Sequence, residues 1–487
     1  MLTALLVLVV ALPVAGALSA VALRGKNVRA VAGAVTGVAA VLACWAVRLD
    51  WGLTFRDTIG GLPWLDGAAG AGALGVFLDP LASVLLLVVA VIGFLTVLYS
   101  TRYLSTRNRE HPVEEREQPR YYFWLLGFVA SMAGVALSPN FLQMFFFWEL
   151  TTVCSWALIS YRRDAKSLRA GFKALLMTQI GGAFFLFAIL VLFARTSSFE
   201  FGALGELPVG LRSWVFLFLM VAAWAKAAQV PFHTWLPDAM EAPTPISAYL
   251  HAAAMVKAGV FLIARTVGAG WAVPPRVAMV LGGMALLTMF IALSYYFVQD
   301  DLKRLLAYST IAHLGYVLLG VSLGALGSVV GFRGGVLHIL CHGVAKATLF
   351  LCAGAVAYIT GTRSISALGG LARTMPLTAA AFFVGVLGVT GVPPFACFWS
   401  KFMILAGAMS LAGPVGPVLV ALVLVESLIS FGWMVHIGQK LFFGVRTPAA
   451  CVNSDPPPAM SAVLVVLMAF SLLAPLVGVP LVGWIGR

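Results

Sequence analysis

The residues of this sequence that could do chemistry are ionisable side chains inside long apolar stretches. A charge at the centre of a bilayer costs about 2.5–3.5 kcal/mol on insertion scales, so a series of such charges indicates a hydrated pathway through the protein interior. Structural ion pairs between helices are the competing interpretation, and they suit Glu426 best because no motif surrounds it. The full set is Glu149, Lys226, Lys257, Lys346, Lys401 and Glu426, with His251, His313, His338, His342 and His436.

Three of these residues are evenly spaced in "HILCHGVAKATLF". His338, His342 and Lys346 stand four residues apart. At 100° per residue they cover only about 80° of one helix face, so a proton could pass along that face. Two histidines four residues apart can also bind zinc, but the Glu of an H-E-x-x-H motif is absent and a cationic lysine follows on the same face. We therefore expect no metal site, and a packed structural histidine pair remains as an alternative.

Prolines interrupt two of the segments that carry a lysine. Pro231 follows Lys226 by five residues, and Pro393 and Pro394 precede Lys401 in "GVTGVPPFACFWSKF". A proline removes a backbone hydrogen bond, and in lipid the freed carbonyl groups must face protein or water. Each break therefore predicts a wet cavity at mid-membrane, and two such breaks in two halves of a chain indicate an internal repeat.

A buried lysine can carry a proton if a neighbouring group switches it between its charged and neutral forms. Glu149, in "FFFWELTTVCSW", is the acidic residue of its apolar stretch. An isolated carboxylate in a transmembrane helix needs a cationic partner. We expect Glu149 to pair with Lys226.

Transmembrane helices must position these residues. The chain of 487 residues is 61% hydrophobic and 10% charged, whereas soluble domains carry about 25% charged residues. Apolar runs of about twenty residues recur along the chain and predict an all-α polytopic membrane protein with about 14 transmembrane helices. The runs are 3–22, 29–47, 76–100, 121–138, 140–160, 171–194, 212–232, 243–264, 274–298, 303–322, 330–357, 376–408, 413–438 and 460–484.

The two breaks suggest a division of the chain into repeats. We expect residues 1–120 to hold three N-terminal helices, and 121–265 to form a first five-helix repeat of helices 4–8. Residues 274–440 are then a second repeat of helices 9–13, and 441–487 hold helix 14. Five is an odd number, so the repeats are expected to be inverted, with helices 7 and 12 broken.

Charge predicts the orientation of the chain. The loops on the side of residues 24–29 hold most of the Lys and Arg, which places that side in the cytoplasm and both termini on the outer, periplasmic side of an inner (plasma) membrane. The net charge of +13 is then mainly an orientation signal. No nucleic-acid partner is expected, because no compact basic domain or aromatic platform is present. We also expect the first apolar run to be retained, because no positive charge precedes it.

The six cysteines form no CxxC pair. Most lie within apolar runs, where a cysteine is normally a small packing residue. No G-x-G-x-x-G motif follows a strand, and no haem motif is present. We expect no disulfide, no iron–sulfur cluster and no other redox cofactor in this chain.

One long segment, "KAAQVPFHTWLPDAMEAPTPISAYLHAAAMVKAGVFLIAR" (226–265), closely resembles the antiporter-like subunits of respiratory complex I. That family also includes the Mrp-type cation/proton antiporters, the membrane-bound group 4 nickel–iron hydrogenases and the formate hydrogenlyases. "FFFWEL", "DLKRLLAYSTIAHLGY" and "HILCHGVAKATLFL" are similar to further family signatures, so the resemblance covers about residues 75–440. It implies a fourteen-helix subunit with two inverted five-helix repeats and a proton path at mid-membrane.

The resemblance also implies roles for single residues, and suggests proton uptake near Lys226 and release near Lys401. In the order of the helices, Glu149 matches the glutamate of helix 5, Lys226 the lysine of broken helix 7, His251 and Lys257 the helix 8 positions, His338, His342 and Lys346 the centre of helix 11, and Lys401 the helix 12 residue that is lysine in some members and glutamate in others.

The leading hypothesis is a proton-translocating subunit of a multisubunit membrane redox complex, either complex I-like or a membrane-bound hydrogenase or formate hydrogenlyase. Its partners would be other membrane subunits, the lipid bilayer and protons, and the quinone, iron–sulfur and nickel sites would belong to those subunits. An Mrp-type Na⁺/H⁺ antiporter subunit is the alternative. A structural scaffold with a silent channel is a third hypothesis, disfavoured because the lysine series is complete.

Three features bear on the parent complex. We expect no long C-terminal lateral helix of the kind found in the largest complex I member. Lysine at position 401 disfavours the member with glutamate there. "GVPPFACFWSKF" is closer to the hydrogenase-linked members.

Overall fold

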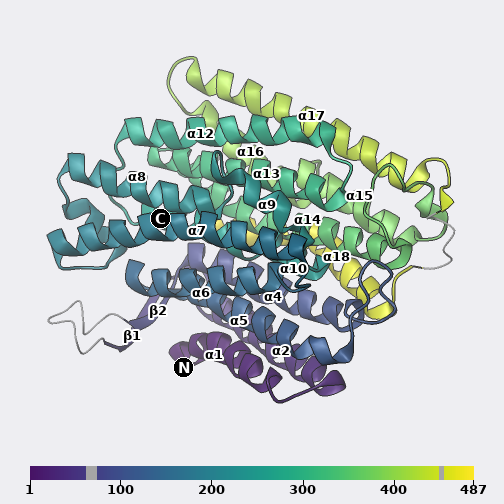
Figure 1. Cartoon of the computed structure of the whole chain (residues 1–487). Helices are drawn as coiled ribbons and strands as arrows, with labels where there is room; N and C mark the ends of the chain where they lie inside the picture. Colours follow the sequence, from purple (N-terminus) through teal and green to yellow (C-terminus); the bar gives the residue numbers. More distant parts are fainter. Residues whose placement is uncertain (62–73, 449–454, 487) are drawn as a thin grey trace.

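The computed structural model describes residues 1–61, 74–448 and 455–486, and it is a bundle of helices that run side by side (Figure 1). In this described part, 13 helical segments are long and apolar enough to cross a membrane. Two shorter apolar helices, α15 (Pro376–Thr390) and α16 (Ala396–Met409), follow one another and supply the interrupted span predicted at 376–408. The predicted class, an all-α polytopic membrane protein, is confirmed.

The remaining helices follow the predicted apolar runs closely. Those of the first part of the chain are α1 (Leu2–Ala20), α2 (Gly25–Leu49), α4 (Pro80–Tyr103), α5 (Gln118–Leu137), α6 (Phe141–Ile159), α7 (Ala165–Thr196), α8 (Val209–Lys226), α9 (Trp235–Asp238), α10 (Thr244–Ala252) and α11 (Met255–Val267). Those of the second part are α12 (Pro275–Ser294), α13 (Leu302–Ala325), α14 (Val329–Thr360), α17 (Val415–Phe443) and α18 (Pro458–Val482).

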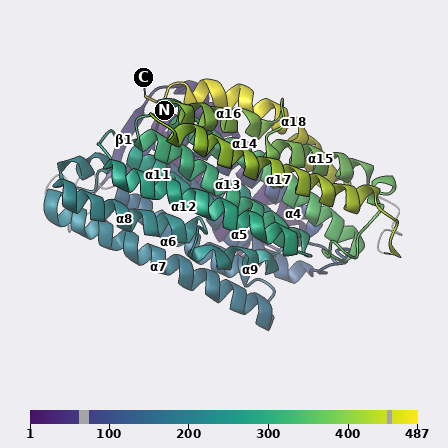
Figure 2. The same ribbon diagram turned by 90° about the horizontal axis from the view of Figure 1, so that it is seen from above.

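A two-stranded antiparallel sheet, β1 (Phe55–Gly60) and β2 (Leu74–Leu78), was not predicted. The side-chain amide of Gln143 ties it to α6: Oε1 accepts from the Gly75 N–H at 2.9 Å, and Nε2 donates to the Gly75 carbonyl at 3.0 Å. The hairpin lies at the end of the bundle where both chain termini also lie (Figures 1 and 2).

The centre of the bundle consists of α10 with α11, α13 and α14, which are buried over their membrane-spanning windows. Helix α14 packs against α4, α10, α13, α15, α16 and α18, while α7 and α8 lie along one edge of the molecule (Figure 2). Close approach of α13 and α14 depends on glycine, because a Cβ at Gly320 would come within 2.6 Å of the Gly335 Cα. The buried histidines and two of the predicted site lysines, Lys257 and Lys346, lie on these central helices.

Both proline breaks are present, and a third break was missed. Helix α8 ends at Lys226, and the chain turns through Pro231 before a short 3₁₀ segment, Phe232–Thr234. Helix α15 ends at Thr390, and α16 begins beyond Pro393 and Pro394. The segment predicted as one helix over 243–264 is itself divided at Ala253 and Ala254, between α10 and α11.

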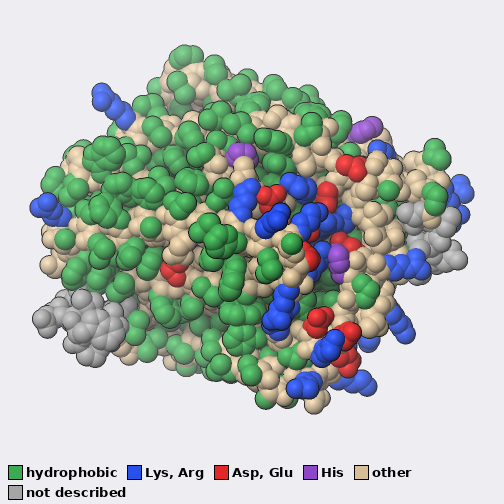
Figure 3. Space-filling model, in the orientation of Figure 1, with side chains coloured by type: hydrophobic (Ala, Val, Ile, Leu, Met, Phe, Trp, Pro, Cys, Tyr) green, Lys and Arg blue, Asp and Glu red, His purple; other side chains and the backbone are tan. Residues whose placement is uncertain are grey.

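Charged side chains gather towards one end of the bundle (Figure 3). There Arg363 contacts Glu110 at 3.2 Å and Asp301 at 3.3 Å, and Arg162 lies 3.8 Å from Glu241. These residues come from loops that the alternation of helices places on one side, and at the opposite end Arg265 donates to Asp79. The loops therefore alternate as predicted, and the chain is a multi-pass membrane protein. The cytoplasmic assignment of the charged end stays a prediction.

The cysteines of the described part, Cys44, Cys154, Cys341, Cys352 and Cys397, are free. Cys451 lies outside the described residues.

Candidate functional site

Lys226 occupies a fully buried position at the end of α8. Its Nζ donates to the Trp148 carbonyl and to the Thr152 hydroxyl, both at 2.7 Å. The ammonium also lies 4.5 Å from the centre of the Trp148 ring, within the range of a cation–π contact. The partners in direct contact are all neutral, and the C-terminal end of α8 adds the negative end of a helix dipole.

Glu149 does not form the direct pair that we expected. In the described part of the chain no ion pair within 4 Å joins it to Lys226. The carboxylate lies against α7 instead, where a Cβ on Gly182 would clash with Oε1. Trp148 and Thr152 share one helix face, and Glu149 points about 100° away from Trp148. It influences Lys226 through space rather than by contact.

Protein groups bind several backbone atoms freed by the break after Lys226. The Trp235 indole N–H donates to the Ala225 carbonyl at 2.9 Å. The Gln229 amide donates to the carbonyls of Ala227 at 3.0 Å and Ile311 at 3.3 Å. Side chains thus satisfy these backbone carbonyls at the break, and water access to Lys226 stays a prediction.

The middle of the site is a hydrogen-bonded series across α11, α14, α13 and α16. The Lys257 Nζ lies 2.7 Å from the His342 Nδ1. His313 Nδ1 lies 3.1 Å from His338 Nε2, and His338 Nδ1 lies 2.8 Å from the Ser400 hydroxyl. The rings of His342 and His313 stack with centroids 5.2 Å apart, without a hydrogen bond between them.

Two predicted members stand beside this series. The Lys346 Nζ donates to the Ser309 hydroxyl at 2.6 Å and the Leu306 carbonyl at 3.2 Å, both on α13. His251 is buried, its ring packs 4.5 Å from that of Phe350, and neither ring nitrogen has a hydrogen-bond partner. Lys346 therefore does not contact His342 directly, although the two residues belong to the row predicted on one face of α14.

Lys401 lies at the second break. Its Nζ donates to the Thr390 carbonyl, the last residue of α15, at 3.0 Å, and to the Ser427 hydroxyl at 2.9 Å. Gly391 makes the close approach possible, because its φ is +87° and a Cβ there would come within 2.9 Å of the Lys401 Cδ. Lys401 thus brings its ammonium group to the C-terminal end of a half-helix, where a positive charge is favoured, whereas the Lys226 ammonium binds the middle of α6.

Glu426 belongs to the site, although no motif pointed to it. It is fully buried, and the Tyr316 hydroxyl donates a hydrogen bond to its Oε2. The Lys401 Nζ lies 4.5 Å from the centre of the same tyrosine ring. That ring also stacks on His313 and His338, with centroid distances of 5.3 and 5.5 Å. Tyr316 therefore connects the histidines, the second lysine and a buried carboxylate.

Sequence reasoning included His313 among the ionisable residues but gave it no place in the proton path, and it missed Tyr316 and Ser400; the structure places all three in the series. The three-residue spacing of His313 and Tyr316, on one face of α13, was a usable signal. Ser400 precedes Lys401 directly, but nothing in the sequence indicated that it faces His338. His436 is exposed and lies beside Trp433 on α17, outside the series. Within the described residues no group of three or more His, Cys, Asp or Glu side chains could hold a metal ion.

A buried series of lysines and histidines at the centre of a polytopic bundle is the arrangement of an ion-conducting membrane subunit. Residues 138–430 match the family model described as "NADH:quinone oxidoreductase/Mrp antiporter, TM", and residues 64–121 match "NADH-Ubiquinone oxidoreductase (complex I), chain 5 N-terminus". The chain belongs to this family of complex I and Mrp antiporter membrane subunits. The resemblance stated from the sequence is confirmed.

Among curated relatives, the NAD(P)H-quinone oxidoreductase chain 5 of Synechocystis sp. is 37% identical over 71% of this chain and 51% of the relative. A chain of the Mrp complex from Dietzia sp. aligns with all of this chain and 52% of its own length, with a TM-score of 0.84 and 28% identity. A chain of the archaeal membrane-bound sulfane sulfur reductase aligns with 99% of this chain and 96% of its own length, with a TM-score of 0.83 and 25% identity. The present chain spans about half the length of the curated relatives it matches.

Proposed function

We propose that this chain carries protons across the membrane as the antiporter-like subunit of a multisubunit membrane complex, driven by redox chemistry in partner subunits. The observation that carries the proposal is the buried series from Lys257 and His342 to His313, His338 and Ser400. Apolar residues surround these groups, so a role in proton transfer accounts for the free-energy cost of burying them.

His338 has the geometry of a relay. Its Nε2 faces His313 and its Nδ1 faces Ser400, so a proton accepted at one nitrogen can leave from the other. Lys257 can deliver a proton to His342 Nδ1 in the same way. The step between His342 and His313 differs, because their rings stack without a hydrogen bond. Transfer there needs a ring rotation or a bridging water, which makes it the natural point of control.

The parent complex is part of the proposal. The structural likeness to a chain of the sulfane sulfur reductase favours a membrane-bound respiratory complex. Redox cofactors would then belong to partner subunits. The second candidate is an Mrp-type Na⁺/H⁺ antiporter subunit, favoured by the equally good superposition on a chain of the Mrp complex. On the same structural likenesses we propose a division of the chain into four regions, with inverted repeats in the middle two. The regions are 1–120, 121–265, 274–440 and 441–487.

The test is the Lys226→Ala variant in the whole complex, reconstituted into vesicles with a pH-sensitive dye. We expect loss of proton translocation under the complex's own driving reaction, because the buried ammonium has no substitute, while the complex still assembles. Lys26→Ala, at an exposed lysine in the first turn of α2, is the matched control. A Na⁺ gradient applied without the driving reaction separates the two candidates: proton movement under that gradient alone supports the antiporter. Normal translocation by Lys226→Ala contradicts the proposed path.

A further inference from the structure

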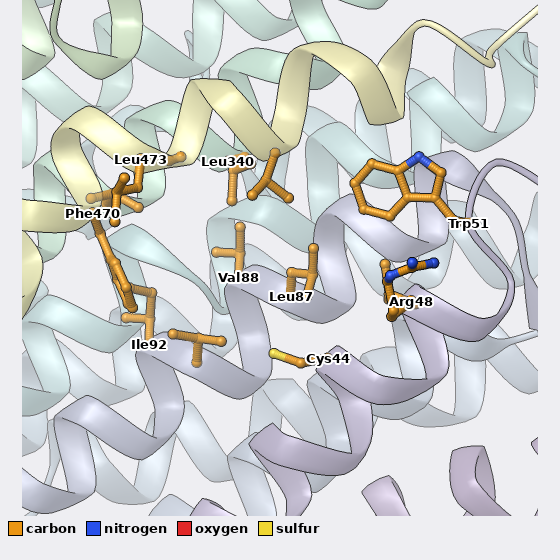
Figure 4. A pocket seen from close by; sticks show the side chains of 14 residues that line it. Cys44, Arg48, Trp51, Leu87, Val88, Ile92, Leu340, Phe470 and Leu473 are labelled. Atoms are coloured by element: carbon orange, nitrogen blue, oxygen red, sulfur yellow. The ribbon is translucent and has the colours of Figure 1, made fainter.

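An apolar groove lies between α2, α4, α14 and α18, away from the buried polar series (Figure 4). Its volume is about 400 Å³, within the range of about 300–1,000 Å³ that is typical of small-molecule pockets. The walls are almost wholly hydrocarbon, and include Leu87, Val88 and Ile92 of α4, Leu340 of α14, and Phe470 and Leu473 of α18.

The groove opens on a surface that suits lipid. Trp45 on α2 and Leu472 and Leu476 on α18 are exposed next to it. Exposed apolar side chains on membrane-spanning helices face acyl chains or another membrane subunit. A hollow in such a surface must be filled, because an unfilled one forfeits the dispersion contacts of its lining atoms.

One end of the groove is polar. Arg48, in the last turn of α2, and Trp51, just after the helix, lie together there (Figure 4). Arg48 is exposed and forms no hydrogen bond or ion pair with any residue of the described part. Arginine and tryptophan are typical of the membrane–water interface, and a guanidinium can bind a phosphate through two parallel hydrogen bonds.

We propose that the groove binds a glycerophospholipid with a net negative headgroup, with one acyl chain along α4 and α18 and the phosphate at Arg48. The charge of the lining selects the headgroup: among the described residues that line the groove, Arg48 is the charged one, and none is a carboxylate that could meet a choline or ethanolamine ammonium. An apolar helix of a partner subunit would leave the guanidinium without an anion, which disfavours a protein occupant.

The groove borders the helix that carries the histidines. Leu340 and Val344 line it from α14, each two residues beyond His338 and His342. Two residues turn a helix by about 200°, so the lipid would pack on the back of α14 while the histidines face the interior. The site is distinct from the polar series, and the proposal does not depend on the direction or identity of the transported ion.

Photocrosslinking tests the proposal. The complete complex is purified in detergent and incubated with phosphatidylglycerol that bears a diazirine on one acyl chain, and in parallel with the phosphatidylcholine analogue. After irradiation, mass spectrometry maps the label. We expect labelling of peptides from α2, α4 and α18 by the phosphatidylglycerol probe, at least fivefold stronger than by the phosphatidylcholine probe.

Two variants and two matched controls locate the site. Arg48→Gln removes the phosphate contact, and Ala474→Phe fills the groove from α18. Both should lower labelling at least fivefold. Arg276→Gln, at an exposed arginine at the start of α12, and Leu428→Phe, at an exposed residue of α17 that does not line the groove, should leave it unchanged.

Equal labelling by the two probes, or labelling that neither variant reduces, overturns the proposal. So does a result in which the isolated chain is labelled and the complex is not, because a partner subunit would then cover the groove. Using two variants from different helices keeps the test valid if one of them fails to fold.

Discussion

The two ends of the buried polar series hold their lysines differently. Lys226 contacts only neutral groups, the Trp148 carbonyl and ring and the Thr152 hydroxyl. Lys401 also binds a carbonyl and a hydroxyl, but it shares Tyr316 with the buried Glu426. The second half therefore has a carboxylate connected to its lysine and to the histidines through one ring, whereas the first half has its carboxylate turned towards α7.

The ends also differ in their link to the middle. Tyr316 stacks on His313 and His338, so the Lys401 end joins the histidines by direct contact. In the described part of the chain no side chain bonds to both Lys226 and Lys257. The difference indicates that the Lys401 end is prearranged for transfer, and that the Lys226 end needs a change of conformation or a water before a proton can leave it.

The largest effects are expected at the two lysines that end the series, Lys226 and Lys401. Lys401→Ala should lower proton translocation by about 100-fold or more, the scale expected for loss of a group that transfers a proton.

Lys401→Glu tests more sharply whether the carboxylate of Glu426 distinguishes the Lys401 end from the Lys226 end. Its carboxylate would stand beside Glu426, and two carboxylates in one buried site repel. Vesicle assays should therefore find the double variant Lys401→Glu, Glu426→Gln more active than Lys401→Glu alone. Equal activity would show that Glu426 does not act on position 401.

Glu426 is expected to have the next largest effect. Glu426→Gln should lower proton translocation by about 10-fold or more, because a side-chain amide cannot take up or release a proton near neutral pH. Tyr316→Phe removes the hydroxyl but keeps the ring that stacks on the histidines, so it should have a smaller effect.

A double variant shows whether Glu426 takes up and releases protons or only balances the charge of Lys401. If Glu426 only neutralises Lys401, the variant Lys401→Met, Glu426→Gln should restore translocation in the same assay. If both residues carry protons, it should remain inactive.

Glu149 should matter less than Lys226, because the two side chains do not touch. Glu149→Gln keeps the shape of the side chain and removes the charge that acts on Lys226 through space. A loss of about 10-fold is expected, against a complete loss for Lys226→Ala. Thr152→Val is the companion variant, since it removes a direct partner of the ammonium. If Glu149→Gln proves as inactive as Lys226→Ala, the carboxylate must swing towards the lysine during turnover, and the difference between the two ends would disappear.

Sequence was sufficient for the spans and for the two proline breaks, since length, hydropathy and proline act locally. The break at Ala253 and Ala254 could not be predicted, because alanine is the best helix former. The contact of Tyr316 with Glu426 joins residues 110 positions apart, which no local pattern encodes. The orientation of Glu149 could not be predicted either, because only the structure shows that the helix face of Trp148 and Thr152 is turned towards Lys226.

The smallest effect is expected at the charged end of the bundle, where function is not at stake. Glu110 is almost fully buried, which alone would raise its pKa, but the nearby His111 side chain, whose Nε2 lies 3.6 Å from the Glu110 Oε1, and the charges of Lys303 and Arg363 outweigh burial and lower the pKa of Glu110 from 4.5 to about 2. A lowered pKa stabilises the folded protein at pH values above the pKa of the unfolded chain, by about 3 kcal/mol here, and this contribution is lost as the pH falls from about 4.5 towards 2.

Glu110→Gln should therefore lower the melting temperature in detergent at pH 7 while leaving translocation per assembled complex unchanged. The difference from the unmodified protein should shrink at pH 3. Glu114→Gln, at an exposed residue of the same loop that pairs only with exposed Arg116, is the control and should change little at either pH. A melting difference for Glu110→Gln that is the same at both pH values would show that packing, and not the charge of Glu110, holds these loops together.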